Sequence, residues 1–156
     1  MPPNTSYNRR TSGQHPLSQQ PQASNHIPPG SGRLVLVIEE DHDVALIIET
    51  MLRYYGYDVE RAETAPDGIR MANLHRPDIV VTELELHEVM VKDLCAAIHQ
   101  GSTDRAPVII GFTSDPDDFA AIDRAAFHQV VRKPNFQLLV TTIETLNPSA
   151  KLPLQS

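Results

Sequence analysis

Five short runs rich in apolar residues recur along the chain, separated by segments of mixed polarity. The runs cover residues 34–38, 57–61, 78–83, 108–112 and 129–132. The run LVLVI at 34–38 is continuously apolar, which is typical of a parallel strand covered on both faces. We therefore predict five β-strands, of which the second, YDVER at 57–61, reads as an edge strand.

Between these runs, apolar residues recur at helical spacing. The first such stripe follows i, i+3, i+4, i+7 and i+11, and Gly56 ends the helix that it predicts. Its members are Val44, Ile47, Ile48, Met51 and Tyr55. Four further helices are predicted. The second runs from Thr64, which is paired with Asp67 as a cap, to about His75, and the third runs from about Val91 to Gln100. The fourth runs from Ser114, paired with Asp117, to about Ala126, and the last runs from Phe136 to about Leu146 with Asn135 as its cap.

Strand and helix thus alternate five times. This alternation predicts an α/β fold, a doubly wound parallel sheet of five strands with five helices on its two faces. In the flavodoxin-like strand order 2-1-3-4-5, the winding reverses between the first and third strands. Ligand chemistry is expected at the carboxyl ends of those strands.

The two ends of the chain differ from this body in composition. Residues 1–32 are rich in Pro, Gln, Ser and Asn, hold Arg9 and Arg10, and contain no acid, although the chain carries a net charge of -7. Such a segment predicts a disordered tail before a domain at 33–146, with a short tail at 147–156. An acidic body argues against nucleic acid as a partner. The absence of a secretory signal or membrane span, and the single Cys95, favour a cytoplasmic protein with no membrane partner.

Polar residues stand where the predicted strands end. Glu39 and Glu40 follow the first strand, Glu83 the third, Thr113 the fourth and Lys133 the fifth. Clustered acids repel one another unless a cation joins them, and Mg²⁺ prefers such oxygen ligands. A nearby hydroxyl and ammonium could hold phosphoryl oxygens. The cofactor prediction is therefore a possible Mg²⁺ site at Glu40 and Glu83, weak or absent.

With these residues in order, the chain resembles the receiver domains of two-component response regulators over about residues 33–146. The family pattern has an acidic pair after the first strand, a phosphoacceptor Asp after the third, Thr or Ser after the fourth and Lys-Pro after the fifth. The resemblance places Glu39-Glu40, Glu83, Thr113 and Lys133-Pro134 at these positions. The stretches GYDV at 56–59 and RPDIVV at 76–81 also look like the family's connections.

The departures from the pattern concern its chemistry. The phosphoacceptor position holds Glu83 instead of Asp, the acidic pair is Glu-Glu, and the Pro-Gly-x-x-Gly region reads His87 to Val91. Val130 takes the aromatic switch position, and Ala126-Phe127 replaces Gly-Ala. The extra methylene of Glu83 moves the carboxylate by about 1.5 Å. A misplacement of about 1 Å can cost roughly 10²-fold in rate.

We therefore expect a single-domain pseudo-receiver that is not phosphorylated, is not an enzyme and acts by binding protein partners, either a histidine kinase or a downstream effector. The alternative is a phospho-accepting shuttle with residual Mg²⁺-dependent phosphotransfer. EEDHD at 39–43 stands where a nucleotide-binding enzyme would need a glycine-rich loop. The resemblance puts the partner surface at parts of 115–125, 129–132 and 136–146. Whether Glu83 imitates the active state, or merely pairs with Lys133, stays open.

Overall fold

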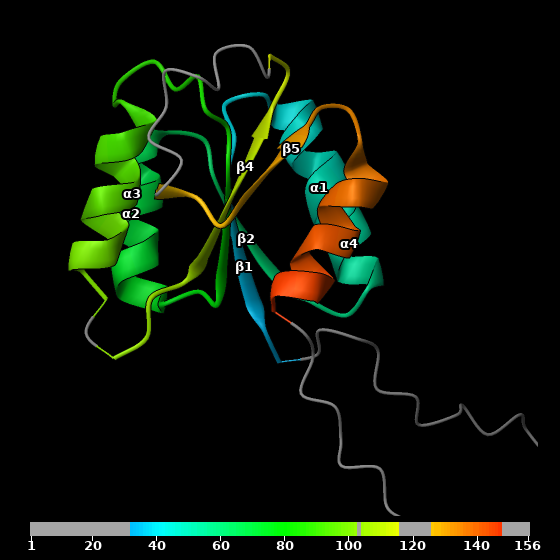
Figure 1. The fold of residues 1–156 in the computed structure, drawn as a ribbon, viewed down its shortest axis with the longest axis horizontal. Coiled ribbons are helices and arrows are strands. Elements are labelled where there is room, and N and C mark those ends of the chain that lie inside the picture. Colours follow the sequence, from blue (N-terminus) through cyan, green and yellow to red (C-terminus); the bar gives the residue numbers. More distant parts are fainter. Residues whose placement is uncertain (1–31, 103, 116–125, 148–156) are drawn as a thin grey trace, which may run out of the picture.

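The computed structural model describes residues 32–102, 104–115 and 126–147. A five-stranded sheet runs through the middle of the molecule, with the order β2-β1-β3-β4-β5 and every pairing parallel (Figure 1). Its strands are β1 (Leu34–Ile38), β2 (Asp58–Ala62), β3 (Ile79–Thr82), β4 (Val108–Thr113) and β5 (Gln129–Arg132). The predicted strand order is confirmed.

Helices cover both faces of this sheet. Helix α1 (His42–Tyr54) and helix α4 (Phe136–Leu146) lie on one face, and α2 (Ala65–His75) and α3 (Val91–Gln100) lie on the other (Figure 1). The side chains of Asp41, Thr64 and Asn135 cap the first turns of α1, α2 and α4 by accepting backbone N–H groups. Gly56 has a φ of 89°, a left-handed conformation that suits glycine after the end of α1.

The core has two parts because the strands are buried on both faces. Val35 and Val37 of β1 join the cluster under α1 and α4, whereas Leu36 and Ile38 join the cluster under α2 and α3. This alternation places successive side chains on opposite sides of the sheet. The continuous apolar run at 34–38 is thereby explained.

The number of helices differs from the prediction. The described residues contain four helices, not five, and the fifth helix, expected from Ser114 to Ala126, falls mostly on residues 116–125, which lie outside the described residues. The expected tails at 1–32 and 147–156 lie outside them as well, except Gly32 and Asn147. Ile47, a member of the predicted helical stripe, is 43% exposed, and the buried residues of α1 are Ala45, Ile48 and Leu52.

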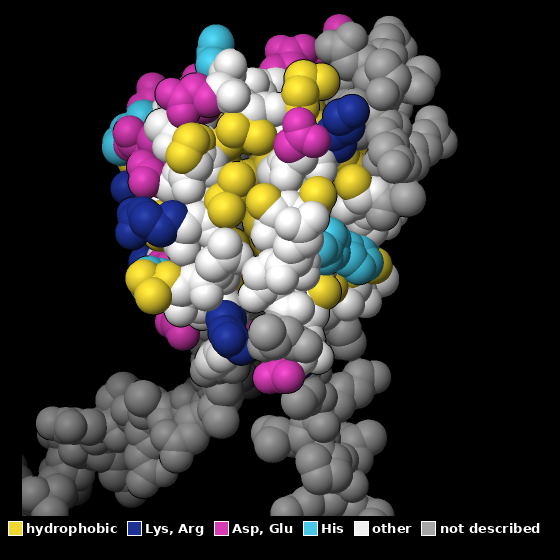
Figure 2. Space-filling view, turned by 90° about the vertical axis from the view of Figure 1, so that its left-hand side faces the viewer, with side chains coloured by type: hydrophobic (Ala, Val, Ile, Leu, Met, Phe, Trp, Pro, Cys, Tyr) yellow, Lys and Arg dark blue, Asp and Glu magenta, His cyan; other side chains and the backbone are white. Residues whose placement is uncertain are grey.

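Hydrophobic side chains also reach the surface over α2 and α3. Figure 2 shows them gathered between charged groups on this side of the molecule, and Leu74 and Met90 are each 66% exposed. Within the described ranges, no helix has the length and apolar character needed to cross a membrane.

Candidate functional site

Four of the predicted site residues come together at the carboxyl edge of the sheet. Glu39 and Glu83 directly follow β1 and β3, which are neighbours, and the backbone N–H of Glu83 donates to the carbonyl of Ile38 at 3.0 Å. At the far side of the edge, the backbone N–H of Lys133 donates to the carbonyl of Thr113 at 2.7 Å. The hydrogen bonds at the ends of the paired strands therefore set the backbone positions of Glu83 and Lys133.

The ammonium of Lys133 lies between two carboxylates. Its Nζ is 2.7 Å from Oε2 of Glu39 and also forms an ion pair with Oε2 of Glu83. All three side chains are largely removed from water, since 13% of Lys133, 4% of Glu39 and 11% of Glu83 remain exposed. We call these three residues the Lys133 triad.

Two opposing effects act on the pKa of Lys133. Burial lowers this pKa because it disfavours the charged form, but the hydrogen bonds and charges of Glu39 and Glu83 raise it. The net pKa lies above the ordinary lysine value. Lys133 is therefore charged at neutral pH and supplies a fixed positive charge to the triad.

The remaining oxygens of the two triad carboxylates accept backbone N–H groups. Oε1 of Glu83 accepts from the N–H of Leu84 at 2.6 Å and of Glu85 at 3.3 Å. Oε1 of Glu39 accepts from the N–H of Asp41 at 3.0 Å. Each carboxylate thus has one oxygen on the ammonium and one on the loop that follows its own strand, an arrangement that offsets the cost of burying its charge.

Glu40 does not join the triad, although it is the next residue after Glu39. Its Oε1 accepts the backbone N–H of His87 at 2.9 Å, and its Oε2 contacts the His87 ring nitrogen Nδ1. The backbone hydrogen bond is the main reason that the pKa of Glu40 lies below its ordinary value. This contact is near solvent, because 87% of His87 and 26% of Glu40 are exposed.

Beneath the triad lies an aromatic pair. The ring centroid of Phe112 is 5.8 Å from Nζ of Lys133 and 5.4 Å from the ring centroid of Phe136. A cation at this distance from an aromatic face is attracted to it. Thr113, which follows Phe112 at the end of β4, is buried with 3% of its surface exposed.

The residues of this edge do not fit a divalent cation in this arrangement. Glu40 and Glu83 were the expected ligands, yet the oxygens of Glu40 contact His87 and those of Glu83 contact Lys133 and two amides. Across residues 32–102, 104–115 and 126–147, no group of three or more His, Cys, Asp or Glu side chains could hold a metal ion. The Lys133 ammonium already lies between the carboxylates of Glu39 and Glu83.

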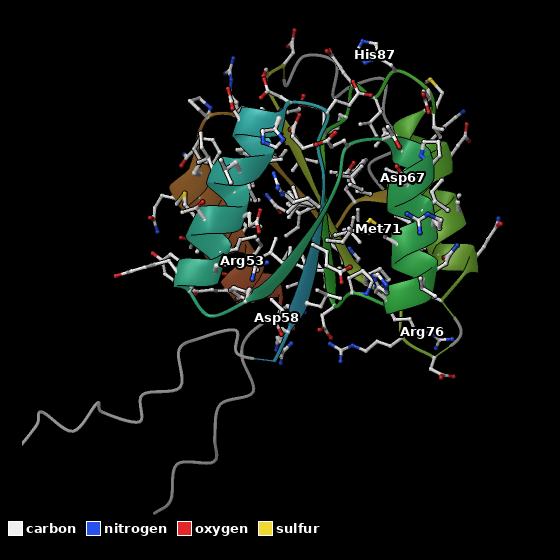
Figure 3. The ribbon with its side chains drawn as sticks, turned by 180° about the vertical axis from the view of Figure 1, so that it is seen from behind. Arg53, Asp58, Asp67, Met71, Arg76 and His87 are labelled. Carbon is white, nitrogen blue, oxygen red and sulfur yellow. The ribbon has the colours of Figure 1, made fainter. Side chains whose placement is uncertain are left out.

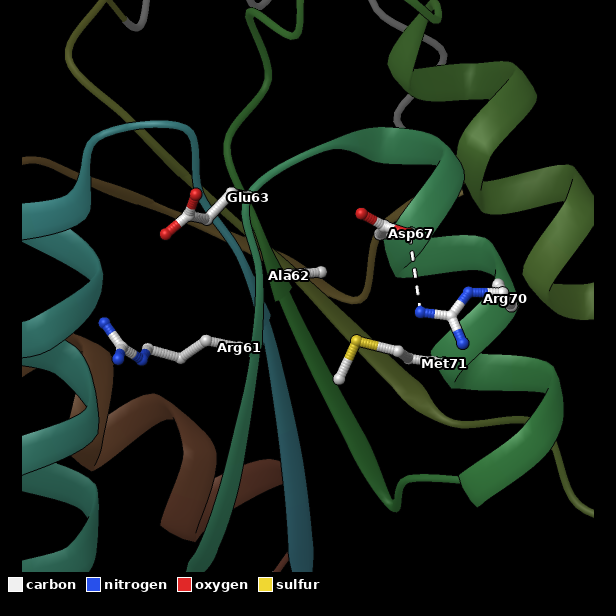
Figure 4. Close-up of a pocket in the computed structure, with 6 residues that line it drawn as sticks. All are labelled: Arg61, Ala62, Glu63, Asp67, Arg70 and Met71. Atoms are coloured by element: carbon white, nitrogen blue, oxygen red, sulfur yellow. Dashed lines mark hydrogen bonds and ion pairs between the residues drawn. The ribbon is translucent and has the colours of Figure 1, made fainter.

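Other candidate groups lie apart from the triad. His42 contacts Glu63 at 3.3 Å on the surface. Cys95 is buried in α3, and its burial raises the thiol pKa to about 12, which makes it an unreactive packing residue at neutral pH. An open pocket of about 480 Å³ lies at β2 and α2, where Arg70 pairs with Asp67 (Figure 4). None of the predicted site residues lines this pocket.

Two participants were not predicted from the sequence as parts of the site. The first is the pair of backbone N–H groups of Leu84 and Glu85, which no pattern of side chains in the sequence predicts. The second is the pairing of His87 with Glu40, since the sequence identifies His87 only as a departure from the family pattern. The signal was present in part, because His87 replaces the family's proline and so supplies a backbone donor that proline lacks.

Comparison with known proteins agrees with this fold. The profile of the response regulator receiver domain matches residues 35–144. The adventurous-gliding motility protein Z of Myxococcus xanthus is 34% identical over 97 residues, which are 62% of this chain and 7% of that protein. The response regulator ArlR of Staphylococcus aureus is 22% identical over 112 residues, 72% of this chain and 51% of ArlR. The chain therefore spans about half, or much less, of these relatives.

Solved structures show the same fold. The CheY-like receiver domain from Methylobacillus flagellatus superposes with a TM-score of 0.65 at 14% identity, covering 73% of this chain and 98% of that one. A response regulator from Thermotoga maritima in complex with Mg²⁺ and BeF superposes with a TM-score of 0.66 at 19% identity, covering 73% and 98%. The profile match spans most of the described residues. The chain belongs to the family of response regulator receiver domains.

Proposed function

We propose that this chain is a pseudo-receiver, which accepts no phosphoryl group and acts in two-component signalling by binding a protein partner. The observation that carries the proposal is the state of Glu83. Both of its oxygens are engaged, one by Lys133 and one by two backbone amides. A carboxylate held in this way is a poor nucleophile, because whichever oxygen attacks phosphorus must give up hydrogen bonds that stabilise its charge.

The same contacts support a site that stays in one conformation, with Glu83 held on Lys133. The Glu83 carboxylate has one negative charge and two oxygens, and one of these oxygens holds Lys133. A phosphoryl group carries nearly two charges and three oxygens. The imitation of a phosphorylated site is therefore partial. Val130 at the family's aromatic switch position supports the same interpretation, since this position has no aromatic side chain that could respond to a change in the site.

Phosphorylation is tested directly by intact mass. The chain is incubated with Mg²⁺ and acetyl phosphate beside a functional receiver as positive control, and we expect no added phosphate. A stoichiometric adduct that is stable to acid and labile to base would contradict the proposal and favour the phospho-accepting shuttle, to which the retained Thr113 and Lys133 would then contribute. The variant Glu83→Asp tests whether the lengthened side chain alone prevents labelling.

The proposed partner surface is made by β5 and α4, together with residues 115–125, of which only Asp115 lies in the described ranges. Leu138 of α4 is 46% exposed there. We expect Leu138→Asp to abolish capture of the partner from native cells, while Leu74→Asp, an exposed position on the other face, retains it. Equal loss with both variants would place the partner surface elsewhere. Removing residues 1–32 from the bait tests whether the N-terminal segment takes part.

A further inference from the structure

Helix α1 carries three of the large hydrophobic side chains that the described residues expose. They are Leu46, Ile47 and Tyr54, which are 46%, 43% and 82% exposed. At 100° per residue, these positions surround Thr50 on the side of the helix opposite its buried face. Figure 3 shows α1 as the outer layer of the molecule on this side, with Arg53 near its C-terminal end.

We propose that this outer face of α1 binds the same face of a second copy of the chain, with the two helices antiparallel. This inference concerns a surface other than the Lys133 triad and the proposed partner surface on α4. It does not depend on whether Glu83 can be phosphorylated.

The charges on α1 favour a second copy of the chain as the partner that binds this face. Asp43 lies in the first turn and Arg53 in the last turn, and both are exposed. In an antiparallel pair, Asp43 of each copy faces Arg53 of the other, whereas a parallel pair would set like charges together. A two-fold axis repeats every contact, so one favourable pairing becomes two.

Arg53 has the capacity for this additional contact. Its Nε donates to Glu49 at 2.9 Å and one terminal nitrogen donates to the carbonyl of Val59 at 2.9 Å. The guanidinium has five N–H donors in total, and 53% of the side chain remains exposed. These internal contacts hold the group in place, so little side-chain entropy is lost when it meets a second acid.

The apolar residues suit the same geometry. With the two-fold axis between positions 47 and 50, Ile47 of each copy packs over Thr50 of the other, and the small Thr50 allows a close approach. Leu46 and Tyr54 flank this contact on either side. A helix of this length covers about 20 Å. The interface is therefore small, and we expect weak association that depends on concentration.

Sedimentation of the full chain over a concentration series is the first test. We expect the average mass to rise from one copy toward two, and Ile47→Asp to weaken the association constant at least about tenfold, since it buries a charge in the apolar centre of the contact. Leu74→Asp is the matched control, an exposed leucine changed to the same acid on another helix, and it should leave association unchanged.

A charge exchange tests the antiparallel orientation. Asp43→Arg and Arg53→Asp should each weaken self-association, because each sets like charges opposite one another. An equimolar mixture of the two variants should associate again, since both contacts across the mixed pair become opposite in sign. Melting curves of the two variants check that each retains its fold.

Three results would overturn the inference. They are a single-copy mass at every concentration, a dimer insensitive to Ile47→Asp, and a mixture of charge variants that stays monomeric while each variant is folded. Each of these leaves the phosphorylation test unaffected, so the two proposals can fail separately.

Discussion

Glu39 and Glu40 are neighbours in the chain, yet they enter two different environments. Glu39 is buried on Lys133 with an Nζ to Oε2 distance of 2.7 Å, whereas Glu40 contacts the largely exposed His87. The first contact joins the ends of β1 and β5, and Glu83 links the end of β3 to the same ammonium, whereas the second contact joins two loops. Because an ion pair withdrawn from water depends on its partner far more than an exposed pair does, the two contacts should respond differently to the same kind of mutation.

The largest effect is expected from Lys133→Ala. The change leaves the carboxylates of Glu39 and Glu83 buried without their cation, so the free energy of unfolding should fall by about 3–5 kcal/mol. Urea denaturation at neutral pH measures it. Lys92→Ala, an exposed lysine on α3, is the control and should change stability by less than about 0.5 kcal/mol. A loss with Lys133→Ala as small as the control's would mean that the triad is solvated.

Glu83→Gln should have a smaller effect, because the amide keeps its shape and an oxygen that can accept from Lys133 or the loop amides. We expect a loss of about 1–3 kcal/mol in the free energy of unfolding, the range for weakening hydrogen bonds to a buried charged group. Glu88→Gln, an exposed position in the same loop, is the control. If Glu83→Gln were as harmful as Lys133→Ala, the charge of Glu83 rather than its hydrogen bonds would dominate the triad.

The buried contact was predictable from the sequence to a greater extent than the exposed one. The ends of β1, β3 and β5 follow from apolar runs and from the strand order, so the convergence of Glu39, Glu83 and Lys133 follows from the topology. The separation of Glu40 from the triad does not. It depends on the conformation of the 83–90 loop, where the N–H of His87 supplies the hydrogen bond, and single-sequence patterns do not determine such loop geometry.

A similar limit applies to α1. Its apolar stripe predicted the helix correctly, but five apolar residues in one stripe could not all be buried. The stripe spans more than the face that meets the sheet, so Ile47 remains exposed. Periodicity thus identifies the helix, while the neighbouring elements decide which apolar residues face solvent.

Alkaline pH should sharpen the difference between the two contacts. The pKa of Lys133 is raised in the folded state, so its stabilising contribution is complete below the ordinary lysine pKa and is lost as pH rises through the folded value. The difference in unfolding free energy between the native chain and Lys133→Met should therefore be constant near neutral pH and decrease above about pH 10. The same comparison with His87→Ala should show no change in this range.

The smallest effect is expected at the exposed contact. His87→Ala removes the ring but keeps the backbone N–H, so stability should change by less than about 1 kcal/mol. The backbone hydrogen bond is the main cause of the lowered pKa of Glu40, and that pKa should therefore stay below its ordinary value in the variant. A lowered carboxylate pKa contributes stability above the ordinary value, and this contribution is lost as pH falls through the folded value. NMR titration of the Glu40 carboxyl carbon in both proteins measures this. A return of the pKa to its ordinary value in His87→Ala would show that the ring, and not the backbone N–H of the loop, lowers the pKa of Glu40.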